Sequence, residues 1–298
     1  MIKRAIKILR YIVETLILLM GMLIFKLMGL KNSANFASFL SIKIGKTIKV
    51  NKLADDNIKN AMPNLDKAQR NDIIKYMWDN LGRVIGEYVH IASLRPCKLA
   101  KFVEIDQETR ENLEYIKNCN KNGKGIIIFS GHIGNWEVGP KFLISQGVKV
   151  ATVYRPLNNP WVEKITAKLR GVDLIEKGVA GSRKIVELLK KGTTIIILAD
   201  QKISEGTAID FFDRPAVTTT SIARIAVKYN IAVMGARTIR IAKKSKFIIA
   251  VEKPLDIKYS DKSESNIKSI TLSINKKLES WISEYPSQWF WVHNRSKK

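Results

Sequence analysis

The feature that most constrains this fold is an alternation of short apolar runs with amphipathic segments between Gly125 and Glu284. The runs are rich in Ile and Val, which is typical of buried strands. Strands alternating with helices predict an α/β fold with a largely parallel sheet flanked by helices on both faces. The predicted strands are Gly125–Phe129, Val148–Tyr154, Val172–Ile175, Thr193–Leu198, Ile231–Ile239 and Phe247–Glu252. The predicted helices are Trp136–Gln146, Trp161–Arg170, Ser182–Lys191, Thr218–Tyr229 and Ile267–Glu284.

A long apolar segment near the N-terminus indicates a membrane. Leu16–Phe25 is unbroken, and the wider run Tyr11–Leu30 is interrupted only by Glu14, Thr15 and Lys26. This is close to the roughly 20 residues that cross a bilayer, and no small-residue cleavage site follows that would indicate a signal peptide. Basic residues flank both ends of the run. The sequence therefore suits a helix that spans the membrane, one that lies in the interface, or a buried hairpin of a soluble domain.

These features divide the chain into two parts. Residues 1–50 are predicted to be a helical membrane-anchoring segment with a short amphipathic helix at Ala34–Ile44. Residues 51–298 are predicted to form one α/β domain that begins with a helical region, Asp55–Ser93, broken at Pro63.

The charge of the chain indicates anionic partners. It has 51 Lys and Arg against 27 Asp and Glu, a net charge of +24 that is spread along the whole sequence. Such a charge attracts nucleic acid, an anionic membrane surface, a phosphorylated lipid or an acidic carrier protein. Because no helix-turn-helix, zinc-finger or ribonucleoprotein motif is present, we expect no nucleic acid partner.

The sequence lacks the usual motifs of metal and cofactor sites. There is no HExxH, the two cysteines Cys97 and Cys119 lie far apart, and no second histidine is near any of the three in the chain. No GxSxG, GxxxxGK[ST] or GxGxxG motif occurs. We therefore expect neither a metal ion nor a cofactor.

The segment GIIIFSGHIGNWEVGP, residues 125–140, places a histidine and a glutamate at a strand-to-helix turn. On one helix, positions i and i+5 point about 140° apart, so His132 and Glu137 can meet only if His132 lies in the turn and Glu137 in the first helical turn. Glu137 would then hold the imidazole in one tautomer, and His132 would act as a general base. The alternative is an ordinary polar contact beside a loop.

Further polar residues follow the predicted strands, where ligands bind in open α/β sheets. Arg155 in YRPLNNP is suited to bidentate binding of a phosphate or carboxylate, or else to a surface ion pair. Asp200 can support a histidine, bind a hydroxyl group or cap a turn. The remaining candidates for substrate binding are Asn135, Asn158, Arg170 and Gln201.

Several segments together resemble the late acyltransferases of lipid A biosynthesis, the lauroyl/myristoyl transferase family of the lysophospholipid acyltransferase-like group. The resemblance covers most of the chain, and the order and spacing of its segments make it specific. The segments are NIKNAMP (57–63), WDNLGRVIGEY (78–88), GHIGNWE (131–137), YRPLNNP (154–160), SRKIVELLKKG (182–192), ADQ (199–201), FFDRPAVTTT (211–220) and QWFWVHNR (288–295).

The resemblance implies an acyltransferase that moves a fatty acyl chain from acyl carrier protein to a hydroxyl of a lipid A precursor. It implies that His132 and Glu137 are the catalytic pair, and that the enzyme acts at the cytoplasmic face of the inner membrane. Two alternatives stay open. A related acyltransferase would use another glycolipid or a lysophospholipid as acceptor, and a basic membrane-binding protein without catalytic activity would also explain the charge and the apolar segment.

Overall fold

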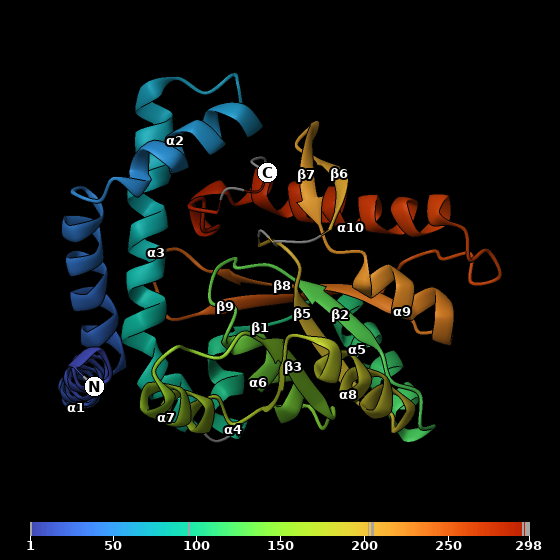
Figure 1. Ribbon diagram of the computed structural model, residues 1–298, viewed down its shortest axis with the longest axis horizontal. Helices are drawn as coiled ribbons and strands as arrows, with labels where there is room; N and C mark the ends of the chain where they lie inside the picture. Colours follow the sequence, from blue (N-terminus) through green and yellow to red (C-terminus); the bar gives the residue numbers. More distant parts are fainter. Residues whose placement is uncertain (1, 95, 202, 204–205, 294, 296–298) are drawn as a thin grey trace.

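The computed structural model describes residues 2–94, 96–201, 203, 206–293 and 295. Within these residues the chain forms a seven-stranded sheet and a separate two-stranded hairpin (Figure 1). The strands of the main sheet are β1 (Val103–Glu104), β2 (Ile127–Ser130), β3 (Val150–Tyr154), β4 (Asp173–Glu176), β5 (Thr194–Leu198), β8 (Val233–Arg240) and β9 (Phe247–Pro254). The hairpin consists of β6 (Thr207–Phe211) and β7 (Arg214–Thr218).

The main sheet is largely parallel, as the alternation predicted. Its order is β1-β9-β8-β2-β5-β3-β4, and every neighbouring pair from β8 to β4 is parallel. Only β9 runs antiparallel to β8, with β1 parallel to β9 at the edge. The carboxyl ends of β2, β5 and β3 therefore lie side by side at one edge of the sheet.

The helices are α1 (Ile2–Gly45), α2 (Val50–Ala61), α3 (Lys67–Ser93), α4 (Pro96–Leu99), α5 (Gln107–Lys121), α6 (Val138–Ser145), α7 (Pro160–Arg170), α8 (Val179–Lys190), α9 (Ser221–Tyr229) and α10 (Glu264–Glu284). Two 3₁₀ turns are η1 (Ala100–Phe102) and η2 (Pro286–Gln288). All five helices predicted after Gly125 are present within a few residues of the expected bounds. The helix α5, the strand β1 and the hairpin β6–β7 were not predicted.

Strand alternation builds a hydrophobic core on each face of the sheet. In β2, Ile127 and Phe129 pack with α3, α9 and α10 on one face, while Ile126, just before the strand, and Ile128 pack with α5 and α6 on the other. Burial on both faces explains why β2 is a continuous apolar run rather than an alternating one.

The C-terminal segment belongs to the first of these cores. Trp289 and Trp291 are almost fully buried, and their rings meet edge to face with centroids 4.7 Å apart. An isolated bridge between Ile133 and Trp289 joins this segment to the turn after β2. These tryptophans therefore hold the tail against the body and are not free to contact a membrane.

The N-terminal helix α1 is bent at Gly29, whose φ of 74° interrupts the helical backbone. The segment after the bend packs on α3 through small residues, because a Cβ at Gly86 would lie 2.4 Å from the carbonyl oxygen of Ser33. The short helix predicted at Ala34–Ile44 is thus the second part of α1. By length and composition, α1 is also the one described helix that is able to cross a membrane.

Candidate active site

His132 and Asp200 meet because two neighbouring parallel strands end in register. Ser130, the last residue of β2, is paired with Leu198, the last residue of β5. Each of the two side chains lies two residues beyond this pair, at the carboxyl edge of the sheet. The Nδ1 atom of His132 is 2.8 Å from Oδ1 of Asp200, and the backbone N–H of His132 donates to Oδ2 at 2.6 Å.

The turn that carries His132 depends on a glycine and on a buried asparagine. Gly134 has a φ of +55°, and a Cβ there would lie 2.0 Å from the carbonyl oxygen of Thr238. Any other residue would move the turn, since both the backbone conformation and the space favour glycine. Asn135 is buried, and its amide donates to Glu87 at 2.7 Å. Its role here is to fix the turn.

Asp200 is the electrostatic partner of His132. Its side chain is fully buried, and the indole N–H of Trp289 donates to its Oδ2 at 2.7 Å. Burial by itself would raise the pKa of this carboxyl, but the charge of His132 and the hydrogen bonds from His132 and Trp289 hold it well below its usual value. Asp200 is thus an anion that can orient the imidazole and stabilise its protonated form.

The other imidazole nitrogen faces the cavity. Nε2 of His132 lies 3.0 Å from the side-chain nitrogen of Gln201, which also lies 3.4 Å from Nε2 of His293. Trp136 packs against the imidazole edge at 5.0 Å between ring centroids. With Nδ1–H directed at Asp200, Nε2 carries a lone pair and can accept the proton of a hydroxyl group that displaces the Gln201 amide.

The structure does not match our expectation that Glu137 contacts the imidazole of His132 and holds it in one tautomer. Glu137 directly precedes α6, and its two carboxylate oxygens bind Arg170, the last residue of α7, at 3.1 and 3.3 Å. Burial would lower the pKa of Arg170, but Glu137 outweighs it and raises that pKa. Asp200 takes the position by the imidazole, because strand register places it there while the helical start of α6 turns Glu137 toward α7.

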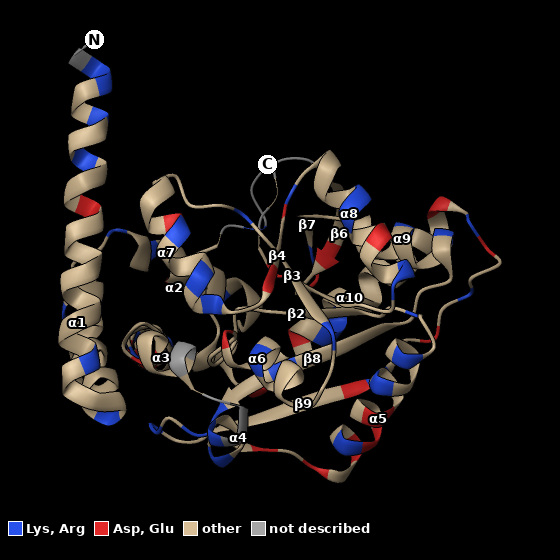
Figure 2. Cartoon of the chain, turned by 90° about the horizontal axis from the view of Figure 1, so that it is seen from below, with Lys and Arg blue, Asp and Glu red and all other residues tan. Residues whose placement is uncertain are grey.

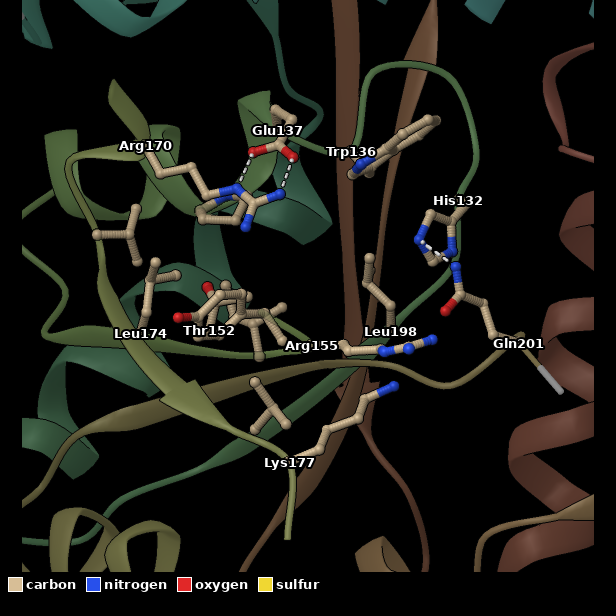
Figure 3. Close-up of a pocket in the computed structure, with 15 residues that line it drawn as sticks. His132, Trp136, Glu137, Thr152, Arg155, Arg170, Leu174, Lys177, Leu198 and Gln201 are labelled. Carbon is tan, nitrogen blue, oxygen red and sulfur yellow. Dashed lines mark hydrogen bonds and ion pairs between the residues drawn. The ribbon is translucent and has the colours of Figure 1, made fainter. Parts of the chain in front are cut away.

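These groups surround a cavity of about 260 Å³ at the ends of β2, β3 and β5 (Figure 3). One wall carries the Glu137–Arg170 pair and another carries His132 with Gln201. The side chains of Arg155 and Lys177 both extend toward the His132 side of the cavity. Between the polar walls the lining is mostly apolar: Pro140, Val172, Leu174, Ile196 and Leu198 lie there together with Thr152.

The cavity brings together five of the predicted residues: His132, Glu137, Arg155, Arg170 and Gln201. Asp200 lies behind His132 and contacts it from the protein interior. Asn135 and Asn158 are not part of the lining; Asn158 is exposed, and its buried neighbour Asn159 caps α7.

The sequence analysis did not identify two residues of the site, Lys177 and Trp289. Lys177 directly follows β4, so the strand-end argument applied to Arg155 also identifies it. Trp289 has no comparable signal, because its contact with Asp200 joins residues 89 positions apart. Among the described residues, no group of three or more His, Cys, Asp or Glu side chains is arranged to hold a metal ion.

Comparisons with known proteins all point to one family of acyltransferases. A family model described as bacterial lipid A biosynthesis acyltransferase matches residues 2–298. The chain is 23% identical to a lipid A biosynthesis acyltransferase of Haemophilus influenzae, over 85% of the chain and 78% of that protein. It is 21% identical to the lipid A biosynthesis myristoyltransferase of Escherichia coli (79% and 72%) and 24% identical to the palmitoleoyltransferase of the same organism (82% and 78%).

Proposed function

This chain belongs to the bacterial lipid A biosynthesis acyltransferase family, and we propose that it moves a fatty acyl chain from acyl carrier protein to a hydroxyl of a lipid A precursor. The observation that carries this proposal is the His132–Asp200 contact at one wall of a cavity whose polar walls are joined by a mostly apolar surface. An oriented base beside an apolar pocket is what deprotonation of a hydroxyl next to a fatty thioester requires.

In the proposed reaction, Nε2 of His132 takes the proton of the acceptor hydroxyl, and Asp200 stabilises the imidazolium. The acceptor oxygen attacks the thioester carbonyl, and the C–S bond breaks as the tetrahedral intermediate collapses. His132 then returns the proton to the leaving thiolate, so the products are an ester and a free thiol. General base catalysis of this kind contributes about 10²–10⁴-fold, with proximity of the two substrates supplying a further large factor.

The other cavity residues have complementary roles in this proposal. The carbonyl oxygen gains negative charge during attack, and the Gln201 amide and Arg155 guanidinium extend toward the His132 side, where that charge develops. Lys177 adds a second positive charge for a phosphate of either substrate. Glu137 acts indirectly in this proposal. Its carboxylate binds the guanidinium of Arg170 and so positions that positive charge at the same cavity.

Two further grooves support an acidic carrier protein as donor. A groove beside the cavity shares Lys177, Leu198 and Gln201 with it. That groove in turn shares Ser182 and Ile225 with a surface groove between α8 and α9. The surface groove combines apolar side chains with four basic ones, Arg183, Arg224, Lys228 and Lys262. We propose that an acidic helix of the carrier binds there, because its charge complements this rim.

The carrier contact is tested by charge reversal. Lys228→Glu with Lys262→Glu should raise KM for the acyl carrier thioester and leave kcat and the KM for a short acyl-pantetheine thioester unchanged. The matched control is Lys121→Glu with Lys124→Glu, at exposed positions that do not line this groove. An unchanged KM in the α8–α9 variant would exclude this groove as the docking site.

The acceptor and the reaction are tested by reconstitution. Purified protein in vesicles is given acyl carrier protein thioesters with a lipid A precursor, an unphosphorylated glycolipid or a lysophospholipid, and the lipids are analysed by mass spectrometry. We expect transfer to the lipid A precursor, lost in His132→Ala. Transfer only to another acceptor would favour the related acyltransferase, and no transfer to any would favour a non-catalytic membrane-binding protein. We further propose that the site faces the cytoplasm at the inner membrane, where the carrier resides.

A further inference from the structure

The first part of α1, residues 2–28, lies along the side of the protein body. Figure 2 shows it as the outermost element, running past α7 and α3, and Figure 1 shows the same segment end-on beside α7. Almost none of its apolar window is buried within the protein. Leu16, Met20, Leu23 and Leu27 are each about half exposed or more, and Leu27 reaches 79%. Something outside this chain must cover that surface.

Polar side chains of the body bind both ends of the apolar run. The amide of Asn159 donates to the carbonyl oxygen of Tyr11 at 2.9 Å and to the carboxylate of Glu14 at 3.0 Å. Near the other end, Nε2 of His90 lies 2.9 Å from the carbonyl oxygen of Phe25. Tyr11 and Phe25 are about 21 Å apart along a helix. A helix that crossed the bilayer with this run at its centre would therefore carry parts of α7 and α3 into the hydrocarbon layer.

The distribution of side chains around α1 also argues against a helix that crosses the bilayer. The partly buried residues Tyr11, Thr15, Leu18, Met22 and Phe25 form one stripe that faces the body. At about 100° per residue, the charged residues of this segment all fall within roughly 100° of the centre of that stripe. They are Lys3, Arg4, Lys7, Arg10, Glu14 and Lys26.

The opposite side of the helix is apolar from its first turns onward. Leu9, Leu16, Met20, Leu23 and Leu27 are spaced so that they share this side. A helix that spans a bilayer has no reason to keep charged and apolar residues on separate sides in the turns outside the membrane. A helix in the interface needs this separation along its whole length.

The second part of α1 extends the same surface after the bend at Gly29. Phe36, Phe39, Leu40 and Ile44 are exposed, and the ammonium group of Lys43 lies 5.7 Å from the ring centroid of Phe39. In both views this part, like the first, is the outermost layer on that side of the molecule. Aromatic residues next to lysine are typical of the membrane interface.

We propose that α1 lies in the plane of an anionic bilayer surface, with both of its parts on the membrane and the whole chain on one side of it. The apolar sides of the two parts enter the outer part of the hydrocarbon layer. The basic residues of the first turns remain at the lipid head groups, on the same side as the body. This inference does not depend on the identity of the acyl donor or acceptor.

The side of the membrane on which residue 5 lies distinguishes a helix in the plane of the membrane from one that crosses it. In a full-length background with Cys97→Ser and Cys119→Ser, single cysteines are introduced as Ala5→Cys and, on the exposed surface of α10, Ser273→Cys. A membrane-impermeant maleimide is added to sealed vesicles of one orientation. We expect both positions to be labelled from the same side. Labelling of the two positions from opposite sides would overturn the proposal.

Depth measurements provide a second readout. Spin labels at Leu16→Cys, Met20→Cys and Leu27→Cys should report similar, shallow depths in vesicles that contain anionic lipid. Leu18→Cys, on the stripe facing the body, is the matched control and should report less contact with lipid. Depth that rises to a maximum at the bilayer centre and falls again along the helix would refute an in-plane orientation.

Discussion

Replacing Asp200 by Asn should abolish most activity by forcing His132 into the wrong tautomer. Oδ2 of Asp200 accepts hydrogen bonds from the backbone N–H of His132 at 2.6 Å and from Trp289 at 2.7 Å. The amide oxygen of an asparagine must occupy this position, because both partners are donors. Its NH₂ group then faces Nδ1 of His132, where Oδ1 now lies at 2.8 Å. Nδ1 becomes the acceptor, the proton moves to Nε2, and the base is lost.

The expected loss in kcat is about 10²–10⁴-fold, the usual contribution of an oriented general base. Single-turnover acyl transfer measures it, and a retained cooperative thermal transition shows that the variant folds. If Asp200 acts through His132, the double variant with His132→Ala should be no slower than His132→Ala alone. A kcat within threefold of the wild type, or additive losses in the double variant, would refute this reasoning.

The same substitution makes a prediction about acid stability. The pKa of Asp200 is lowered in the folded protein, so its contribution to stability is complete above the unfolded value of about 3.9 and is lost as pH falls through the folded value. The difference in unfolding free energy between wild type and Asp200→Asn should therefore shrink below about pH 4. Urea titrations between pH 3 and pH 7 measure it, and a constant difference would contradict the assignment of an ionised carboxyl.

Four further substitutions test the surroundings of this pair. Glu137→Gln and Arg170→Lys should each lower kcat, and the two losses should not add, since both break one ion pair facing the cavity; additive losses in the double variant would separate their roles. Arg155→Lys should raise KM for the substrate whose phosphate it binds, because lysine cannot form a bidentate contact; unchanged kinetics would leave Arg155 as a surface residue. Glu87→Gln should cost about 3–5 kcal/mol of stability in urea unfolding, because it leaves the guanidinium of Arg240 buried without its carboxylate; a cost below 1 kcal/mol would show that Arg240 finds another partner.

Sequence alone was enough for six of the seven strands of the main sheet and for the position of His132. The strands β2 and β5 are short Ile-rich runs. Such a run predicts a buried strand from its own few residues, without knowledge of the rest of the fold. The break after Ser130 is equally local, since Gly134 permits a turn that other residues cannot adopt. His132 could therefore be placed at the end of a strand, and the apolar run in α1 could be recognised as long enough to cross a membrane.

Tertiary structure decided which carboxylate serves His132 and how α1 meets the rest of the chain. Asp200 lies 68 positions from His132, and only the hydrogen-bond register between β2 and β5 makes them neighbours. Glu137 is much closer in sequence, yet the start of α6 directs it to Arg170. In the same way, the stripe of α1 that faces the body is defined by contacts with α3 and α7, more than 60 residues away. Local sequence patterns specify backbone conformation, whereas strand order and helix docking arise from the packing of the whole chain, and the partners of buried charges follow from that packing.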